Sequence, residues 1–82
     1  MIRLSTPGKI IKGIYSGWYI YIESLYGGYL ILLSNMNNFE GNGKTTKIQG
    51  SQGYDNWVEN YQSVELTFEI NEWEVEWVGA GL

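Results

Sequence analysis

The sequence predicts an α+β domain, in which a small antiparallel sheet is built on a hairpin over residues 17–33 and one helix packs on it. Two observations predict this class. Apolar residues alternate with period two before a glycine pair, and an apolar stripe with helical spacing follows over residues 60–71. An alternating segment at 73–78 predicts a C-terminal strand. Because the chain has only 82 residues, we expect a single domain, 1–82.

The hairpin is the clearest local pattern. Residues 17–23 read GWYIYIE and alternate as a half-buried strand does, whereas residues 29–33 read YLILL, a continuous apolar run typical of a central strand covered on both faces. Gly27 and Gly28 lie between them and can supply the positive φ of a tight turn. An irregular first strand over residues 9–15 is expected to precede the hairpin.

The segment before the C-terminal strand has two interpretations. Residues 63–70 read SVELTFEI and alternate as a strand would, so an all-β fold is the alternative. A strand here would require a hairpin turn at Asn71 and Glu72, which lacks the Asn-Gly or Asp-Gly chemistry of tight turns. It would also set Glu69 opposite Glu74, where like charges repel.

A helix over about 60–71 avoids both problems. It places Tyr61, Val64 and Phe68 on one stripe, with Asn60 or Ser63 as the N-cap. It would also cover one face of the apolar central strand. We therefore predict the helix.

A long polar segment separates the two halves of the chain. Residues 34–53 are rich in Asn, Gly, Ser and Gln and predict a loop, with a possible short strand at 45–49. The GNGKTT run at 41–46 resembles the end of a phosphate-binding P-loop. The position of the first motif glycine is occupied by Asn38, however, and so short a chain cannot supply a nucleotide-binding sheet. We interpret the run as surface loop.

Composition argues against an enzyme. The chain has no cysteine and no histidine, so neither a thiol nor an imidazole is present for nucleophilic or general-base catalysis. The glutamates form a run rather than a cleft-lined pair, and no calcium-binding loop motif is present. We expect no catalytic residue, no metal ligand and no cofactor. Four tryptophans, seven tyrosines and two phenylalanines can instead build a core in a short chain.

Charge is divided unevenly along the chain. Residues 1–47 contain all five basic residues and two acids, a net charge of +3, whereas seven acids and no base follow, a net charge of −7. Phosphate backbones are bound by Lys and Arg, so the C-terminal half is not expected to bind nucleic acid. It suits a partner with a basic surface, although acids also serve simply to keep an aromatic-rich chain soluble.

The candidate partner-binding residues come from two segments of the acidic half. Residues 53–59 combine aromatic anchors with charge, a pairing typical of binding hot spots, although Trp57 could equally fill the core. The helix presents glutamates at i, i+4 and i+7 spacing. The predicted set is Tyr54, Asp55, Trp57, Glu59, Glu65, Glu69 and Glu72.

The ends and the apolar runs predict a cytoplasmic location. The N-terminus lacks the long apolar core of a secretory signal, and the most apolar stretch, residues 18–33, is interrupted by Glu23 and two glycines. We expect no membrane contact. The oligomeric state is left open.

Several motifs together resemble small bacterial immunity proteins of polymorphic and contact-dependent toxin systems. They are WYIYIE at 18–23 with GGYLILL at 27–33, YDNWVE at 54–59, and WEVEW at 73–77. The sequence departs from the pattern at Leu66 and Ile70, which give the helix region its strand-like alternation. The resemblance implies an antitoxin role, binding one cognate toxin domain and blocking its active site or its substrate path.

We therefore expect an immunity protein that neutralises a cognate toxin, a basic nuclease being the fitting target. Complementary charge accelerates the encounter of such partners. Two other classes are alternatives. A carbohydrate- or ligand-binding β-module would use exposed Trp and Tyr with Asn from residues 34–43, and a phage or assembly protein would pair sheet edges or aromatic patches.

Overall fold

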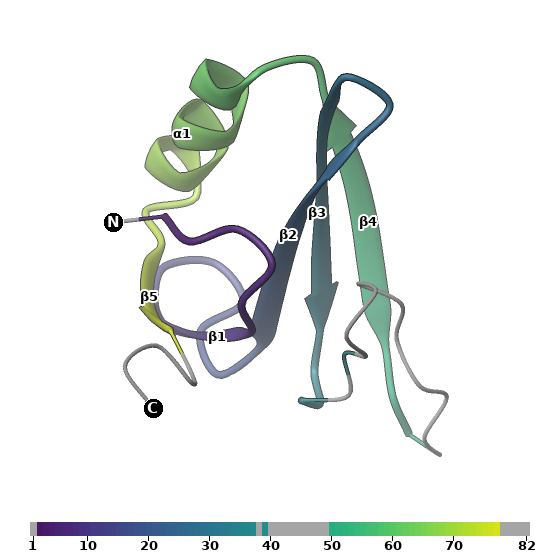
Figure 1. Ribbon diagram of the computed structural model, residues 1–82. Coiled ribbons are helices and arrows are strands. Elements are labelled where there is room, and N and C mark those ends of the chain that lie inside the picture. The colour runs from purple at the N-terminus through teal and green to yellow at the C-terminus, as the bar shows by residue number, and fades with distance from the viewer. Residues whose placement is uncertain (1, 38, 40–49, 78–82) are drawn as a thin grey trace.

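The protein folds as a five-stranded antiparallel sheet with one helix packed on it, which confirms the α+β prediction. The structure is a computed structural model and describes residues 2–37, 39 and 50–77. The strand order in the sheet is β4-β3-β2-β1-β5 (Figure 1). The elements are β1 (Gly8–Lys12), β2 (Tyr19–Leu25), β3 (Gly28–Ser34), β4 (Gly53–Val58), α1 (Tyr61–Ile70) and β5 (Glu74–Trp77).

The predicted hairpin is confirmed as β2 and β3, which pair from Tyr19↔Ser34 to Leu25↔Gly28. The turn consists of Tyr26 and Gly27, whose φ angles are 50° and 75°. Positive values at both positions are what a two-residue turn of the I′ kind requires. The turn is therefore shorter than expected, because the second glycine of the pair, Gly28, already belongs to β3.

The predicted helix is confirmed as α1, and the strand alternative is wrong. Asn60 is the N-cap, and its side-chain Oδ1 accepts a hydrogen bond from the Ser63 backbone N–H at 2.9 Å. Val64 is fully buried against the sheet, whereas Leu66 and Ile70, which produced the strand-like alternation, are exposed to solvent. The Asn60 cap and the burial of Val64 therefore explain why this segment is a helix and not a strand.

One strand, β4, was missing from the sequence-based description, which treated residues 53–59 as a segment leaving a loop. β4 pairs with β3 from Tyr29↔Val58 to Ser34↔Gly53. All its residues are exposed except the half-buried Val58, so it has no apolar alternation that would mark it as a strand. The possible strand at 45–49 and the GNGKTT run at 41–46 lie outside the described residues.

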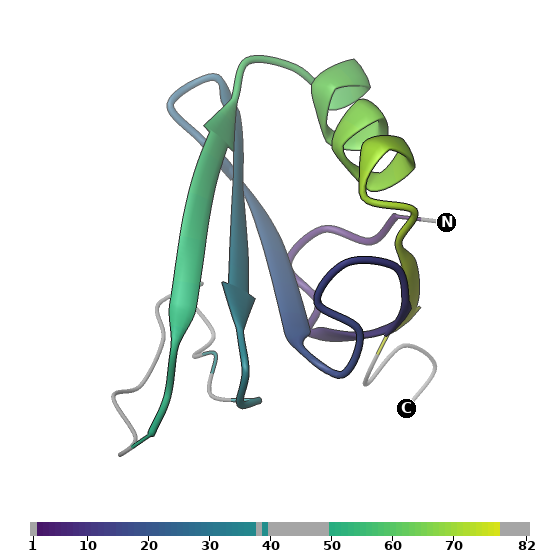
Figure 2. The same cartoon turned by 180° about the vertical axis from the view of Figure 1, so that it is seen from behind.

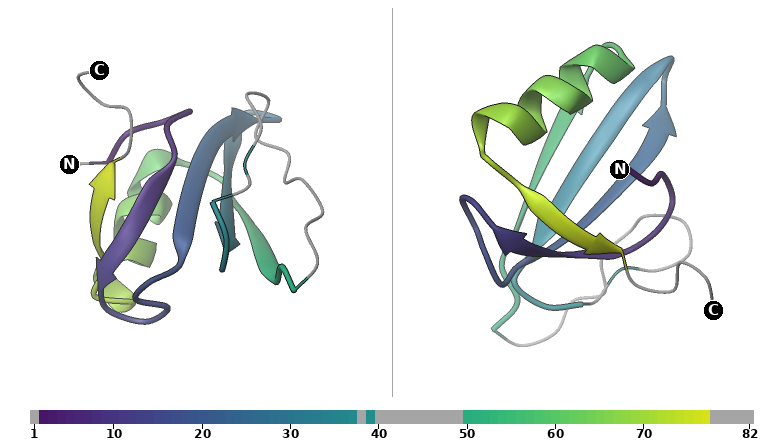
Figure 3. Two further views of the ribbon diagram at one scale, coloured as in Figure 1. Left: turned by 90° about the horizontal axis from the view of Figure 1, so that it is seen from below. Right: turned by 90° about the vertical axis from the view of Figure 1, so that its left-hand side faces the viewer.

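The N- and C-terminal strands complete the sheet. β1 pairs with β2 on one side and with β5 on the other, so the first irregular strand and the C-terminal strand are both present. The sheet is strongly twisted, and β1 and β5 run steeply across the direction of β3 and β4 (Figure 3). The helix lies on the concave side of this sheet (Figure 2).

The core fills the space between the helix and the concave face. Strand alternation and register place Ile20, Ile22, Ile31 and Leu33 on this face. The buried residues of this core cluster are Ile10, Ile20, Ile22, Ile31, Leu33, Val64 and Trp73. The prediction that β3 is central is confirmed, since it has a strand on each side. The helix covers one face, and on the other face the buried Tyr21 of β2 packs against Phe39. Leu30 and Leu32 point away from the helix and remain half-buried.

Candidate functional site

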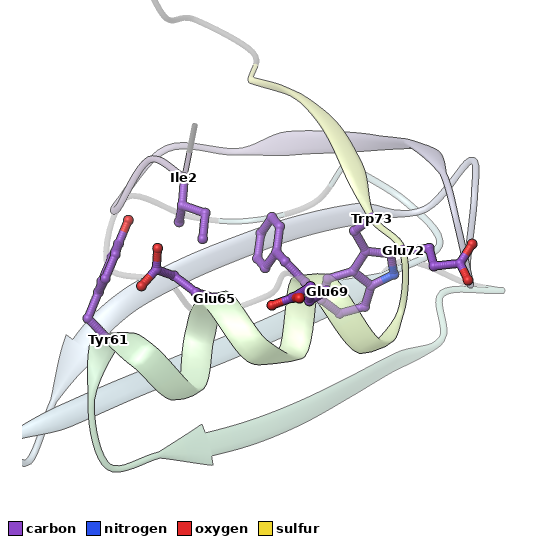
Figure 4. A pocket seen from close by; sticks show the side chains of 7 residues that line it. Ile2, Tyr61, Glu65, Glu69, Glu72 and Trp73 are labelled. Atoms are coloured by element: carbon purple, nitrogen blue, oxygen red, sulfur yellow. The ribbon is translucent and has the colours of Figure 1, made fainter.

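A shallow groove runs along the side of α1 that faces the N-terminal segment and β5. We call it the helix groove. Three glutamates line it, namely Glu65, Glu69 and Glu72, together with the apolar side chains of Ile2, Tyr61, Phe68 and Trp73 (Figure 4). Acidic groups therefore alternate with aromatic rings over the length of the helix.

Helical periodicity explains why these side chains meet. Residues three and four apart share a helix face, so Tyr61, Glu65 and Phe68 follow one line and Glu69 lies beside it, whereas Glu72 follows just after the helix ends. Glu65 and Glu69 are exposed, whereas Phe68 is half-buried. Glu65 and Glu69 thus share one helix face as predicted, and Glu72, just beyond the helix, lines the same groove.

Aromatic contacts hold the apolar side of the helix groove. The Phe68 ring meets Trp73 edge to face, with centroids 5.3 Å apart, and lies nearly parallel to Trp77 at 6.4 Å. The Trp73 indole N–H donates a hydrogen bond to the carbonyl oxygen of Ile14 at 2.6 Å. The rings are fixed by the fold, so the groove presents preorganised apolar surface beside its carboxylates.

The end of α1 places the last glutamate of the groove. The Trp73 N–H donates to the Phe68 carbonyl oxygen at 2.9 Å, and the Glu72 N–H donates to that of Glu69 at 3.1 Å. This pattern is a Schellman motif, whose left-handed residue is usually glycine. Here Glu72 occupies that position with a φ of 56°. A residue with a β-carbon is strained in this conformation.

The acidic half of the chain is not uniformly acidic in space. β5 lies beside β1, where Lys9 is the register partner of Glu76 and Lys12 that of Glu74. The Lys12 Nζ lies 3.1 Å from the Glu74 Oε2. In the described part of the chain, no cation is within ion-pair distance of Glu65, Glu69 or Glu72. The three glutamates of the helix groove therefore keep their charge unneutralised, whereas the charge of Glu74 is paired.

The four candidate residues outside the helix occupy other surfaces. Tyr54 is the register partner of Leu33 and so points to the helix side of the sheet, whereas Asp55 and Trp57 are the partners of Leu32 and Leu30, which point away from the helix. Asp55 and Trp57 therefore point to the opposite side. Glu59 is exposed just beyond the end of β4. The structure brings three of the seven predicted residues together in the helix groove and leaves the other four at or near the β4 edge.

Trp57 neither fills the core nor projects freely. It is 44% exposed, and its indole N–H donates to the carbonyl oxygen of Leu25 at 2.8 Å. The ring lies against Gly28, where an added β-carbon would come within 2.5 Å of Trp57 Cζ2. Trp57 thus anchors the edge strand to the turn of the neighbouring hairpin.

The sequence analysis missed an aromatic cluster on the helix side of the sheet. Tyr15, Trp18 and Tyr54 have ring centroids 4.9 to 5.7 Å apart, and Trp18 stacks on Tyr54 with an interplanar angle of 9°. Tyr15 is held in a left-handed conformation between Gly13 and Gly17. In the sequence, only these two glycines point to the unusual conformation of Tyr15. The cluster itself could not be predicted, because Tyr54 lies far from the other two residues along the chain.

No family model, curated protein or solved structure matches this chain. Within the described ranges, no group of three or more Asp and Glu side chains is placed to hold a metal ion. No helix there has the length and hydropathy of a membrane span. The chemistry that the site does offer is that of a preorganised acidic and aromatic surface.

Proposed function

We propose that this domain is a non-catalytic binding protein of the immunity type, which neutralises a cognate toxin domain by covering a basic surface with its helix groove. The observation that carries the proposal is the line of Glu65, Glu69 and Glu72 beside exposed and half-buried aromatic rings. Charged and aromatic side chains that stand together on a rigid element are typical of interface hot spots. A nuclease would supply the basic surface, because it must hold a phosphate backbone.

The cost of the acidic surface to the free protein also supports a binding role. Glu65 and Glu69 are like charges at i, i+4, which destabilises a helix. Glu69 and Glu72 lie at the C-terminal end of α1, where the helix dipole disfavours negative charge, and no basic residue is in the last turn. Glu72 additionally occupies a position that favours glycine. Strained and locally unfavourable residues are often retained for function.

The proposal is tested by retention of a partner from the native host. The tagged domain is incubated with host lysate and washed at about 0.05 M and at about 0.5 M salt, across which screening of exposed charge pairs strengthens. We expect one basic protein to be retained at low salt and weakened at high salt. The double variant Glu65→Lys/Glu69→Lys should reduce its affinity by more than about tenfold, since it replaces attraction by repulsion.

A control of equal charge change is available for the single variant Glu65→Lys, since each Glu→Lys substitution raises the net charge by two. Glu23→Lys reverses a charge on the opposite side of the sheet, in β2. It should leave the partner bound, whereas equal losses in both variants would remove the helix groove as the contact surface. A domain that retains no protein but changes its Trp fluorescence with oligosaccharides would favour the ligand-binding alternative. A stable homo-oligomer alone would favour the assembly alternative.

A further inference from the structure

In the part of the chain that the structure describes, β4 forms an edge of the sheet whose protection against strand pairing consists of one charged residue, Asp55. Among the described residues it has a strand neighbour on one side only, namely β3. Natural edges are blunted by lysine, proline, bulges or shortness. β4 has six residues, no lysine or proline, and an uninterrupted register with β3. The opposite edge, β5, has four residues and a register shift against β1.

The backbone groups that point outward from β4 can be assigned from the ladder. The Asn35 N–H donates to the Gln52 carbonyl oxygen at 3.0 Å, which makes these two a hydrogen-bonded pair. Bonded and non-bonded pairs alternate along an antiparallel ladder. Every second residue after Gln52 therefore bonds β3, and the residues between direct their N–H and C=O groups outward. Those residues are Gly53, Asp55 and Trp57.

A strand added along this edge would meet a different surface on each side of the sheet. Side chains opposite Asp55 would lie on the side away from the helix, beside its carboxylate. The next side chains along would lie on the helix side, at a crevice of about 160 Å³ between β4 and the C-terminal half of α1. The buried Ile31 and Leu33 line this crevice, and Thr67 and Asn71 of the helix border it.

The size of the crevice identifies what it can hold. Pockets for drug-sized ligands begin at about 300 Å³, so this crevice is too small for one and suits a single apolar side chain. In strand addition, main-chain hydrogen bonds supply affinity and such pockets select alternate side chains. A strand that fits β4 would therefore alternate basic residues, opposite Asp55, with apolar ones over the crevice.

A second copy of β4 is a poor occupant of the same edge. Hydrogen-bonded pairing requires outward-facing residues to stand opposite one another. The symmetric register that uses all three sets Asp55 directly against Asp55 of the other copy, with Gly53 against Trp57 on either side. Like charges opposite one another destabilise a ladder, and Asp55 is the only charged residue of β4. The edge thus discriminates against itself and favours a basic strand.

We propose that the β4 edge binds an extended basic segment of the partner protein by strand addition, with a Lys or Arg opposite Asp55 and an apolar side chain in the crevice beside α1. This inference rests on the proposed function for the partner being a basic protein. It adds a second contact surface, because the β4 edge and the helix groove lie on different sides of α1 (Figure 1, Figure 4).

A synthetic peptide tests the inference directly. The probe is a ten-residue peptide that alternates lysine with valine, added at up to about 1 mM to detect weak binding. We expect the amide protons of Gly53, Asp55 and Trp57 to become protected from exchange, while those of Tyr54 and Asn56, already bonded to β3, stay as they were. Absence of binding, or changes confined to α1, would overturn the inference.

A second peptide shows whether binding depends on the alternating order of the residues or only on the amino-acid composition of the peptide. It has the same residues, but its lysines form one block, so it cannot place basic and apolar side chains on opposite sides of a strand. It should bind at least about fivefold more weakly, as expected when cross-strand pairs are lost. Equal affinity for the two peptides would show non-specific charge attraction and would count against strand addition.

Two substitutions at Asp55 distinguish the contribution of its backbone N–H to peptide binding from that of its carboxylate. Asp55→Asn removes only the charge and should weaken the alternating peptide about twofold to fivefold. Asp55→Pro also removes the outward N–H, which an edge strand tolerates, and should weaken it about tenfold or more. Equal effects of the two variants would contradict main-chain pairing.

A charge exchange tests the inference even if the proline variant fails to fold. Asp55→Lys should lose the lysine–valine peptide and gain a glutamate–valine peptide of the same length, because the sign opposite position 55 is reversed. Unchanged preference would overturn the pairing. If the peptide binds β4 but no host protein is retained, the proposed function fails alone. If Glu65→Lys/Glu69→Lys releases the partner and Asp55→Pro does not, only strand addition fails.

Discussion

The indole N–H of Trp57 donates a hydrogen bond to the carbonyl oxygen of Leu25, 2.8 Å away, and so joins the edge strand to the turn of the β2–β3 hairpin. Leu25 is the register partner of Gly28, against which the same indole ring packs. Trp57 was expected to be either a binding anchor or a core residue. Its observed position gives it a structural task at the sheet edge, and the first prediction follows from it.

Gly28→Ala should destabilise the fold. A β-carbon at this position would meet the Val58 carbonyl oxygen and the Trp57 ring, so the edge strand must shift. Overpacking of this kind costs about 1–3 kcal/mol, and we expect the midpoint of thermal unfolding to fall accordingly. Gly27→Asn is the control, because a β-carbon added at Gly27 would meet no atom within 4 Å beyond its chain neighbours, and Asn tolerates the positive φ. Equal losses in both variants would disprove the close contact at Gly28.

Glu72→Gly should stabilise the free protein and weaken partner binding. Glycine suits the left-handed position of the Schellman motif, and removing the carboxylate relieves an unfavourable charge at the helix C-terminus. We expect a gain of about 0.5–1 kcal/mol in the free energy of unfolding, after the greater freedom of glycine in the unfolded chain is subtracted. Urea denaturation measures it. Glu72→Gln removes the charge but keeps the strain, so it should gain less. If Glu72→Gly lowered the free energy of unfolding, the backbone of Glu72 would not be strained.

Asn60→Ala should weaken α1 at its start. The Asn60 side chain accepts from the Ser63 N–H at 2.9 Å, and an alanine leaves this donor only the longer bond to the Asn60 carbonyl oxygen, at 3.2 Å. The expected cost is about 1 kcal/mol, measured as a lower urea midpoint. Asn60→Asp retains an acceptor oxygen at the same place and should cost much less. Identical midpoints for Ala and Asp would mean that the cap contributes little.

Val64→Ala and Leu66→Ala form a matched pair on one helix. Val64 is fully buried, so its truncation leaves a cavity and should cost about 1–3 kcal/mol. Leu66 is 54% exposed. The larger truncation there should therefore change the free energy of unfolding by less than about 0.5 kcal/mol. Both are measured by chemical denaturation. The reverse order would mean that the other face of α1 packs on the sheet.

The ion pair of Lys12 and Glu74 should contribute little. Its side chains are 73% and 58% exposed. Exposed pairs are screened by salt and entropically costly to hold. A double-mutant cycle with Lys12→Ala and Glu74→Ala should give a coupling energy below about 1 kcal/mol. The same cycle repeated at high salt should give a smaller value still. A coupling that is large and independent of salt would contradict this assignment.

The sequence by itself determined those elements that depend on neighbours close along the chain. The β2–β3 hairpin follows from alternation and a glycine at the turn, since its pairing needs no distant partner. The helix follows from Asn60 and the buried position of Val64, both within one or two turns. The shared face of Glu65 and Glu69 follows from helical periodicity alone, whereas Glu72 lies beyond the end of α1 and is placed by the left-handed turn there.

Only the tertiary structure decided which distant segments share a surface. β4 has no alternation of its own, and its pairing with β3 joins segments that are separated by the long polar stretch of the chain. The same pairing exposes the outward groups of Asp55 and separates that residue from the helix groove. β1 and β5 likewise bring Lys12 to Glu74 and cancel part of a charge imbalance that is plain in the sequence. Periodicity is a local property that residue order records, whereas the pairing of distant strands depends on contacts that only the folded chain makes.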